Sequence, residues 1–172
     1  MDLWQLVSGK QYIAKLIEVF ETKHYAYAVM EFAKGPDLFN EIADREDKGN
    51  RFTEIEALHL LLQMLKAIET CHLAGFAHLD VKPENFLFND KKELLLCDFG
   101  AAEPFEKAPY AIDTGNYVEG LDDEIRHLER VRGTACYVSP EIYTHKMFSS
   151  RSDVWSVVSY SFNFFLVFLI II

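Results

Sequence analysis

Cysteine, positive charge and an export signal are all scarce in this sequence, and each scarcity argues against a class of protein. The three cysteines, Cys71, Cys97 and Cys136, form no C-x-x-C pair, which argues against a zinc knuckle or a disulfide framework. A formal net charge of −10 argues against a basic nucleic-acid surface, so we expect no nucleic-acid partner. The opening "MDLWQLVSGK" lacks the basic and apolar regions of a secretory signal. Together these features predict an intracellular protein of the cytoplasm.

Glycine and proline are also few, at 8 and 5 residues, which argues against a collagen-like or low-complexity chain. Half of the residues are apolar and 26% are charged, and this is the composition of an ordinary globular protein. The length of 172 residues is enough for one domain with a well-buried core.

Charge is missing altogether from residues 154–172, "VWSVVSYSFNFFLVFLIII", a run of 19 residues. A run of this length is sufficient to span a bilayer. Two other interpretations stay open at this point: a buried helix, and a tail that belongs to no fold.

The first fifty residues are predicted to contain a helix end, a hairpin and a short helix. Gly9 is the expected helix stop, and Leu3, Leu6 and Val7 lie on one side of that helix. Runs rich in β-formers predict the two antiparallel strands. The elements are expected at residues 2–9, at 12–20 with 25–32, and at 37–46.

The clearest element is a helix over residues 53–75. Thr53 and Glu56 form a capping-box pattern, and Gly75 is a natural C-terminal stop. Two apolar stripes at helical spacing predict that this helix is buried on most sides. The stripes are Ile55, Leu58, Leu62 and Leu65, and Leu61, Met64, Ile68 and Cys71.

A second hairpin is expected from strands at residues 86–88 and 93–97. Folding the chain back at "NDKK" places Phe88 opposite Glu93. Counting outward from that pair brings Asn85 close to Asp98, within a residue or two of register.

The stretch "HLDVKPENFLF", residues 78–88, carries an acid, a cation and an amide close together, and the hairpin adds a second acid, Asp98. The oxygens of Asn85 and Asp98 suit Mg²⁺, which keeps waters and phosphate oxygens as its other ligands. Lys82 can offset charge on a phosphoryl group, and Asp80 can orient a hydroxyl and accept its proton. Any one of these residues alone would fit a solvated turn, but the set predicts phosphoryl transfer.

Four motifs in order give a resemblance to the protein kinases. "HLDVKPENFLF" resembles their catalytic loop, and "DFG" at 98–100 resembles their metal-binding motif. "GTACYVSPE" at 133–141 is similar to the end of the activation segment, and "SDVWS" at 152–156 to the start of the central large-lobe helix. The lysine in "DVKPEN" and the "GT…SPE" pattern are of the Ser/Thr type. The sequences of the hinge and the catalytic loop are most similar to those of the calcium/calmodulin-dependent kinase group.

The resemblance implies an α+β, two-lobe kinase-like fold with an incomplete small lobe, a β-hairpin, and a partial, mainly helical large lobe. The implied divisions are 1–34 for the partial small lobe and hinge, 35–160 for the partial large lobe, and 161–172 for an apolar tail. It implies ATP and Mg²⁺ as cofactors, and a protein substrate with a Ser or Thr hydroxyl as partner.

The resemblance also implies roles for individual residues. Asp80 would be the catalytic base and Lys82 the phosphate contact, with Thr134 bracing both. Asn85 and Asp98 would hold Mg²⁺.

The segment "VMEFAKGPDLF" would be the hinge of the nucleotide site. Met30 would be the gatekeeper, and Glu31 and Ala33 would offer backbone groups to adenine. Asp37 would reach the ribose, and Leu87 would pack beneath the adenine ring.

Two residues would support the catalytic loop, and one residue departs from the family pattern. Asp153 would tie down the loop backbone, and His78 would pack beneath the "DFG" turn. Leu79 replaces an arginine that in the family pairs with an activation-segment phosphate, so we do not expect control by such phosphorylation.

The segment from Asp98 to Glu141 is long, at 44 residues. Within it Leu121, Ile125 and Leu128 recur at helical spacing, which is compatible with a short docking helix, although a loop is the default for such a segment. Asp122 and Arg126 would form an i, i+4 pair in that helix.

The Gly-rich loop, strand lysine and ion-pair glutamate of the family precede its hinge and do not occur in this sequence. The last residues depart from the family as well, and we interpret them as a premature end of the domain. On this basis the isolated chain is expected to be inactive and poorly stable. Two alternatives to an enzyme are a non-catalytic, pseudokinase-type binding module and a regulator anchored in the membrane by residues 154–172.

Overall fold

The computed structural model describes residues 3–105 and 126–169, and for residues 161–169 it describes the helical backbone alone. These residues form helices and small, two-stranded antiparallel sheets, which confirms the α+β class predicted from the sequence. The chain divides into two compact units, and each is described by itself. The first unit comprises Met1–Ala67 and Pro83–Asp98, and the second comprises Ile68–Lys82 and Phe99–Ile172.

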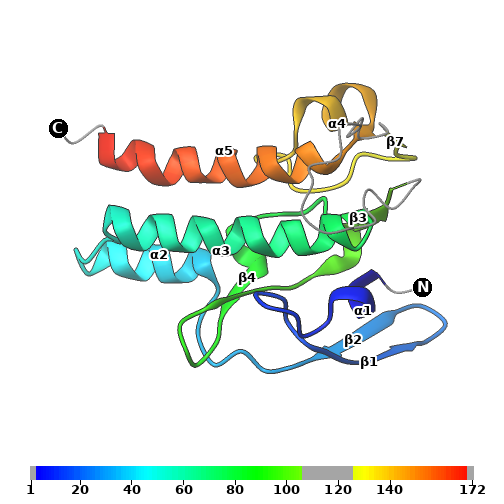
Figure 1. Cartoon of the computed structure of the whole chain (residues 1–172), viewed down its shortest axis with the longest axis horizontal. Coiled ribbons are helices and arrows are strands. Elements are labelled where there is room, and N and C mark those ends of the chain that lie inside the picture. The colour runs from blue at the N-terminus through cyan, green and yellow to red at the C-terminus, as the bar shows by residue number, and fades with distance from the viewer. Residues whose placement is uncertain (1–2, 106–125, 170–172) are drawn as a thin grey trace, which may run out of the picture. The chain divides into compact units, whose positions relative to one another are not determined.

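The first unit holds the two longer hairpins and the first helices (Figure 1). Helix α3 begins in this unit, and its last residues belong to the second. The elements are α1 (Leu3–Val7), β1 (Leu16–Glu21), β2 (Ala26–Met30), α2 (Leu38–Asp47), α3 (Glu54–Leu73), the 3-10 turn η1 (Pro83–Asn85), β4 (Phe86–Phe88) and β5 (Leu94–Leu96).

The N-terminal helix α1 ends as the sequence predicts, and Gly9 follows it with φ +69°, the left-handed conformation of a helix stop. The buried side differs from the prediction. Trp4 and Val7 are buried, whereas Leu6 is exposed. The indole Nε1 of Trp4 donates to the Ala14 carbonyl over 2.8 Å, so α1 is attached to the chain that leads into β1.

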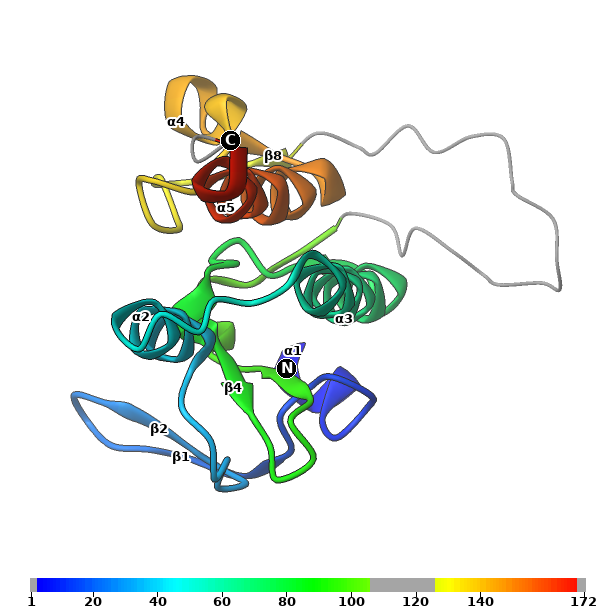
Figure 2. The ribbon, with the colours of Figure 1, turned by 90° about the vertical axis from the view of Figure 1, so that its left-hand side faces the viewer.

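Strands β1 and β2 pair antiparallel as predicted, with Leu16 opposite Met30. Figure 2 shows this hairpin in blue. Phe20 lies opposite Tyr27, and their rings stack with centroids 5.0 Å apart. Cross-strand aromatic pairs of this kind stabilise a hairpin whose side chains are largely exposed.

The long helix α3 begins with the predicted capping box. The Thr53 N–H donates to Glu56 Oε2 over 2.8 Å, and the Glu56 N–H donates to Thr53 Oγ1 over 3.2 Å. The expectation that α3 is buried on most sides is wrong, because one stripe packs inward and the other faces solvent. The buried members are Met64, Ile68 and Cys71, and the exposed members are Ile55, Leu58 and Leu62.

The β4–β5 hairpin forms at the predicted place with a register one residue away from the prediction. Phe88 lies opposite Leu94 rather than Glu93. The turn accounts for the shift: the Asn89 N–H donates to the Glu93 carbonyl over 2.9 Å, and Lys92 adopts φ +61°. Asn89 and Glu93 therefore close the hairpin, and the strand pairs begin one residue further in.

The second unit surrounds a small apolar core. Residues of this core are Ala77, Leu79, Leu128, Ile142 and Phe148. The elements are the end of α3, β3 (Phe76–Ala77), η2 (Phe99–Ala101), β6 (Glu103–Pro104), β7 (Arg126–His127), α4 (Pro140–His145), β8 (Met147–Phe148) and α5 (Ser150–Leu169).

The docking helix considered for the middle of the activation segment is not present where the structure describes that segment. Arg126 lies in strand β7, opposite Phe148. Leu128 is buried, and its N–H donates to the Lys146 carbonyl over 2.7 Å. The other members of the expected helix, Leu121, Asp122 and Ile125, lie outside the described residues.

Helix α5 contains much of the uncharged C-terminal run. Its first turns bury one face, including Asp153 and Val157, and expose Trp155 and Val158. Among the helices of residues 3–105 and 126–169, none combines the length and the apolarity that crossing a bilayer requires.

Candidate functional site

In the second unit, three side chains predicted to be catalytic form a closed hydrogen-bonded cluster. The Thr134 hydroxyl donates to Asp80 Oδ1 over 2.8 Å and accepts from the Lys82 ammonium over 3.0 Å. The ammonium of Lys82 also lies 2.8 Å from Asp80 Oδ2. The side chains of Asp80 and Lys82 are 15% and 21% exposed, so the pair is partly shielded from water yet remains accessible.

The backbone that carries Asp80 is held by a buried carboxylate from α5. Asp153 is fully buried, and its Oδ2 and Oδ1 accept from the N–H groups of His78 and Leu79, each over 2.8 Å. Leu79 adopts φ +63°, a left-handed conformation that a branched residue rarely takes without outside support. Both contacts agree with the predicted role of Asp153 in tying down the loop.

Asp153 keeps its negative charge despite its burial. Burial raises the pKa of its carboxyl. The hydrogen bond and charge of His72 and the N–H of His78 lower the pKa by more than burial raises it, so the pKa lies below its ordinary value. His72 Nε2 lies 2.8 Å from Asp153 Oδ2. The sequence marked Asp153 but gave no sign that His72, 81 residues away, contacts it.

His78 packs as the sequence predicted. Its side chain is fully buried, and its ring lies edge-on to Phe99 with centroids 4.9 Å apart. Its Nδ1 accepts from the Asp80 N–H over 3.3 Å, so His78 orients the backbone of the neighbouring acid.

In the first unit, the β4–β5 hairpin brings the two predicted metal ligands to one end. The Cys97 N–H donates to the Asn85 carbonyl over 2.9 Å, so Asn85 faces the residue immediately before Asp98. Asn85 is 5% exposed, and Asp98 has φ +59°. Asp98 therefore directly follows the residue that is bonded to Asn85 across the hairpin, which agrees with the predicted proximity to within a residue of register.

The chemistry of this donor set fits Mg²⁺ better than a softer metal. An amide oxygen and a carboxylate oxygen are hard ligands. Burial, with the charges of Asp98 and Asp37, raises the pKa of the Cys97 thiol to about 12, so it stays protonated and is a poor ligand. Within residues 3–105 and 126–169, no cluster of three or more His, Cys, Asp or Glu gathers as a metal centre.

The residues predicted to contact adenine lie at the end of the β1–β2 hairpin and beyond it. Met30 pairs with Leu16, and the Glu31 N–H donates to the Lys15 carbonyl over 2.9 Å. The Glu31 carboxylate accepts from the Lys15 N–H over 2.6 Å. Ala33 is half-buried.

Asp37 has a structural role that was not predicted from the sequence. It is the N-cap of α2: its Oδ1 accepts from the Asn40 N–H over 2.8 Å, and its Oδ2 accepts from the Asn40 side-chain amide over 2.6 Å. Asp37 also bridges to Leu87 in an isolated antiparallel pair, which joins the hinge segment to β4.

An ion pair in the second unit was also missed. Arg132 Nη2 lies 2.5 Å from Glu103 Oε1, and Arg132 Nη1 donates to the Gly100 carbonyl over 3.5 Å. Glu103 lies in β6 and pairs with Ala77 of β3. The residues are distant in sequence, so neither charge pattern nor spacing could have found the contact.

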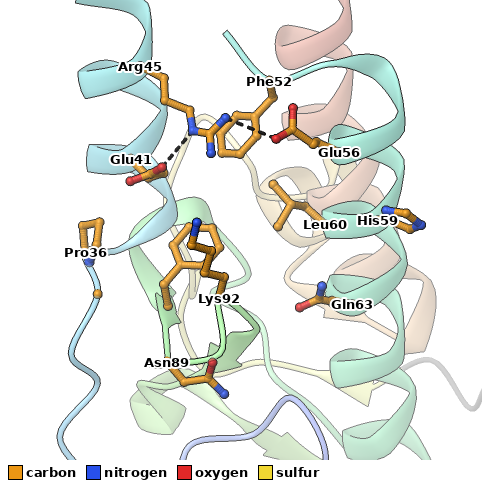
Figure 3. Close-up of a pocket in the computed structure, with 12 residues that line it drawn as sticks. Pro36, Glu41, Arg45, Phe52, Glu56, His59, Leu60, Gln63, Asn89 and Lys92 are labelled. Atoms are coloured by element: carbon orange, nitrogen blue, oxygen red, sulfur yellow. Dashed lines mark hydrogen bonds and ion pairs between the residues drawn. The ribbon is translucent and has the colours of Figure 1, made fainter. Parts of the chain in front are cut away.

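A pocket of about 470 Å³ lies in the first unit between α2, α3 and the turn of the β4–β5 hairpin (Figure 3). Arg45 spans one wall, with its guanidinium 3.9 Å from the centre of the Phe52 ring. It donates to Glu41 over 2.8 Å and lies 3.4 Å from Glu56. The hydrogen bond to Glu41 raises the pKa of Arg45 above its ordinary value.

The pocket does not coincide with the predicted nucleotide site. Gly35 and Pro36 of the hinge segment line it, but none of the individual residues predicted to contact the nucleotide or Mg²⁺ does. The charge of Arg45 is balanced by the two glutamates of its own walls. We interpret this arrangement as packing between α2 and α3, in which the arginine stem and fork cover Phe52.

Comparison with known proteins gives matches over nearly the whole chain. The family model described as protein kinase domain matches residues 1–166. CDPK-related kinase 4 of Arabidopsis thaliana is 34% identical over 165 residues, covering 93% of this chain and 24% of the relative. A CDPK-related protein kinase of Daucus carota is 35% identical over 165 residues, with the same coverage of 93% and 24%. CBL-interacting protein kinase 11 of Oryza sativa subsp. japonica is 34% identical over 145 residues, covering 84% and 25%. The chain thus spans about a quarter of the length of these relatives.

Proposed function

Because the chain belongs to the protein kinase domain family, we propose that the protein is a serine/threonine protein kinase that transfers the γ-phosphate of ATP to a hydroxyl of a protein substrate. The observation that carries the proposal is the Asp80–Thr134–Lys82 cluster, which unites a base, a hydroxyl and a cation. The lysine at position 82 and the "GT…SPE" pattern favour Ser and Thr over Tyr as the acceptor.

In this proposal Asp80 orients the substrate hydroxyl and accepts its proton as the oxygen attacks the γ-phosphorus of ATP. The bond from that phosphorus to the bridging oxygen breaks, and ADP is the leaving group. Thr134 holds Oδ1 of Asp80, so the carboxylate keeps one orientation while Oδ2 faces Lys82. The ammonium of Lys82 offsets negative charge on the phosphoryl group being transferred. Asp153 and His78 set the backbone beneath Asp80.

Asn85 and Asp98 would hold Mg²⁺ through one amide and one carboxylate oxygen. When bound, the ion neutralises charge on the phosphate oxygens. The β4–β5 hairpin fixes the spacing of both ligands, because the Asn85 carbonyl is bonded to the N–H before Asp98.

The hinge segment would bind adenine through its backbone. The N–H of Glu31 donates to Lys15, so the carbonyl is the group that Glu31 offers a purine, and Ala33 offers the next backbone groups. Met30 would be the gatekeeper, and Leu87 would pack beneath the base. Asp37 would reach the ribose only by sharing its carboxylate with the cap of α2.

The test is Asp80→Asn in the protein at its native length, with Asp90→Asn as a control that removes an exposed acid from a hairpin turn. Phosphotransfer to a protein substrate should fall by about 10²–10⁴ in Asp80→Asn, the usual contribution of a general base. Binding of MgATP, followed by calorimetry, should remain close to wild type in both variants.

Unchanged turnover in Asp80→Asn would refute the role of Asp80. A wild-type protein that binds MgATP without detectable phosphotransfer would favour a non-catalytic binding module instead. The expectation that the 172-residue chain alone is inactive stays a prediction, to be measured in the same assay.

A further inference from the structure

Three consecutive residues near the end of the activation segment each contact a different part of the second unit. Arg132 contacts Glu103 and Gly100, which follow the "DF" of the metal motif. Gly133 packs on the backbone of Leu79. Thr134 contacts Asp80 and Lys82. A displacement of Arg132 would therefore be transmitted to the hydroxyl that holds the proposed base.

Glu103 is a firm anchor for Arg132 because its backbone is paired. It lies opposite Ala77, one residue before His78. The side chains of Arg132 and Glu103 are 28% and 29% exposed, so water screens this pair less than it screens a fully exposed ion pair.

Gly133 packs closely on the catalytic loop and restricts movement of the backbone between Arg132 and Thr134. A Cβ at this position would lie 2.4 Å from the Leu79 carbonyl oxygen, and φ is +89°. The two backbones are in direct contact, so the segment cannot move toward the catalytic loop and is kept from moving away by Arg132.

We propose that Arg132 and Glu103 are positioning residues that hold Thr134 in its contact with Asp80. This inference rests on the proposed kinase function and adds to it a means of ordering residues 132–134, near the end of the activation segment. Both charges of the pair are supplied by the chain itself. The ordering of residues 132–134 therefore needs no added phosphate group. Leu79, against which Gly133 packs, carries no charge that could bind one.

The experiment compares Glu103→Gln with the charge-exchanged variant Glu103→Arg/Arg132→Glu and with the control Arg130→Gln, in the protein at its native length. Arg130 is exposed and lies two residues from Arg132. In Glu103→Gln we expect kcat to fall by about tenfold, with KM for ATP within about twofold of wild type, because the base and not the nucleotide is misplaced. The exchanged pair should recover most of the loss, and Arg130→Gln should resemble wild type.

A second measurement does not depend on activity. The N–H groups of Tyr137 and Val138 donate to the Thr134 carbonyl over 2.9 and 3.1 Å. Hydrogen exchange of these amides should accelerate in Glu103→Gln and return toward wild type in the exchanged pair.

The two measurements separate failure of this inference from failure of the proposed function. If the wild type transfers phosphate but Glu103→Gln changes neither kcat nor exchange, the positioning role is overturned. If the exchanged pair recovers nothing, the charge pairing is overturned. If the wild type transfers no phosphate, the proposed function fails. Faster hydrogen exchange of the Tyr137 and Val138 amides in Glu103→Gln would still show that the Arg132–Glu103 pair holds this segment. Loss of activity on phosphatase treatment of the wild type would refute ordering without phosphate.

Discussion

Replacement of Asp153 by asparagine removes one charge from the buried support of the catalytic loop without changing its shape. In the wild type, Oδ1 accepts from the Leu79 N–H, and Oδ2 accepts from the His78 N–H and contacts His72 Nε2. Asparagine has one acceptor oxygen, so one side of the carboxylate becomes an NH₂ that faces another donor.

The expected cost follows from these contacts. At best one buried backbone N–H loses its acceptor, which costs about 1–3 kcal/mol, and the remaining hydrogen bonds lose their charge assistance. The total should be about 3 kcal/mol, the lower end of the range for breaking a buried pair. The Asp153→Ala variant, which leaves all three donors without this partner, should lose at least as much.

Urea denaturation of the chain at neutral pH measures the change, with Asp44→Asn as control. Asp44 pairs with Lys48 on the exposed surface over 2.6 Å, so its loss should cost less than about 1 kcal/mol. A change below about 1 kcal/mol in Asp153→Asn would refute the view that this carboxylate holds the loop.

The pH dependence supplies a second check. The folded pKa of Asp153 lies below its ordinary value, so its carboxylate contributes in full above the unfolded pKa, near 3.9, and the contribution is lost as pH falls through the folded pKa. The stability difference between wild type and Asp153→Asn should shrink as pH falls below about 4, where the carboxylate of the unfolded chain takes up its proton. A constant difference down to pH 2 would contradict the assignment.

Two further changes test features of the fold. Arg45→Lys keeps the charge but loses the planar stack on Phe52, so the free energy of unfolding should fall by about 1 kcal/mol; an unchanged urea midpoint would show that the stack contributes nothing. Gly133→Ala should cost about 1–3 kcal/mol more than Gly49→Ala in the same assay, because both have positive φ but only at Gly133 would the added Cβ meet a carbonyl oxygen at 2.4 Å, whereas Gly49 has nothing within 4 Å. Equal costs would mean that the backbone at Gly133 relaxes freely.

Features set by neighbours in sequence were predictable. The Thr53–Glu56 capping box needs only three residues of spacing, and it forms as expected. The β4–β5 hairpin was placed correctly, yet its register was wrong by one residue. The left-handed Lys92 moved the closing pair. Every residue of β4 and β5 is apolar, so a slip of one residue still leaves apolar side chains on both faces and the sequence pattern does not distinguish the two registers.

Features set by distant contacts were not predictable. Both stripes of α3 are apolar, so the sequence could not say that Met64 packs inward while Ile55 faces solvent. The spacing around Arg126 fits a helix, but pairing with Phe148 places it in a strand. The ion pair of Arg132 depends on a fold that brings β6 beside it, which no local pattern encodes. Asp153 and Thr134 could be predicted because both lie within sequence motifs of the family, "SDVWS" and "GTACYVSPE".

The support of the catalytic loop by α5 also sets an order of events during synthesis. Asp153 follows Leu79 by 74 residues, which the ribosome adds in roughly 4–15 s at typical elongation rates. Until then the N–H groups of His78 and Leu79 lack their carboxylate acceptor, and the left-handed backbone at Leu79 lacks the contact that stabilises it. The catalytic loop of the growing chain therefore lacks its support, and the geometry around Asp80 forms only after the first turn of α5 has been synthesised.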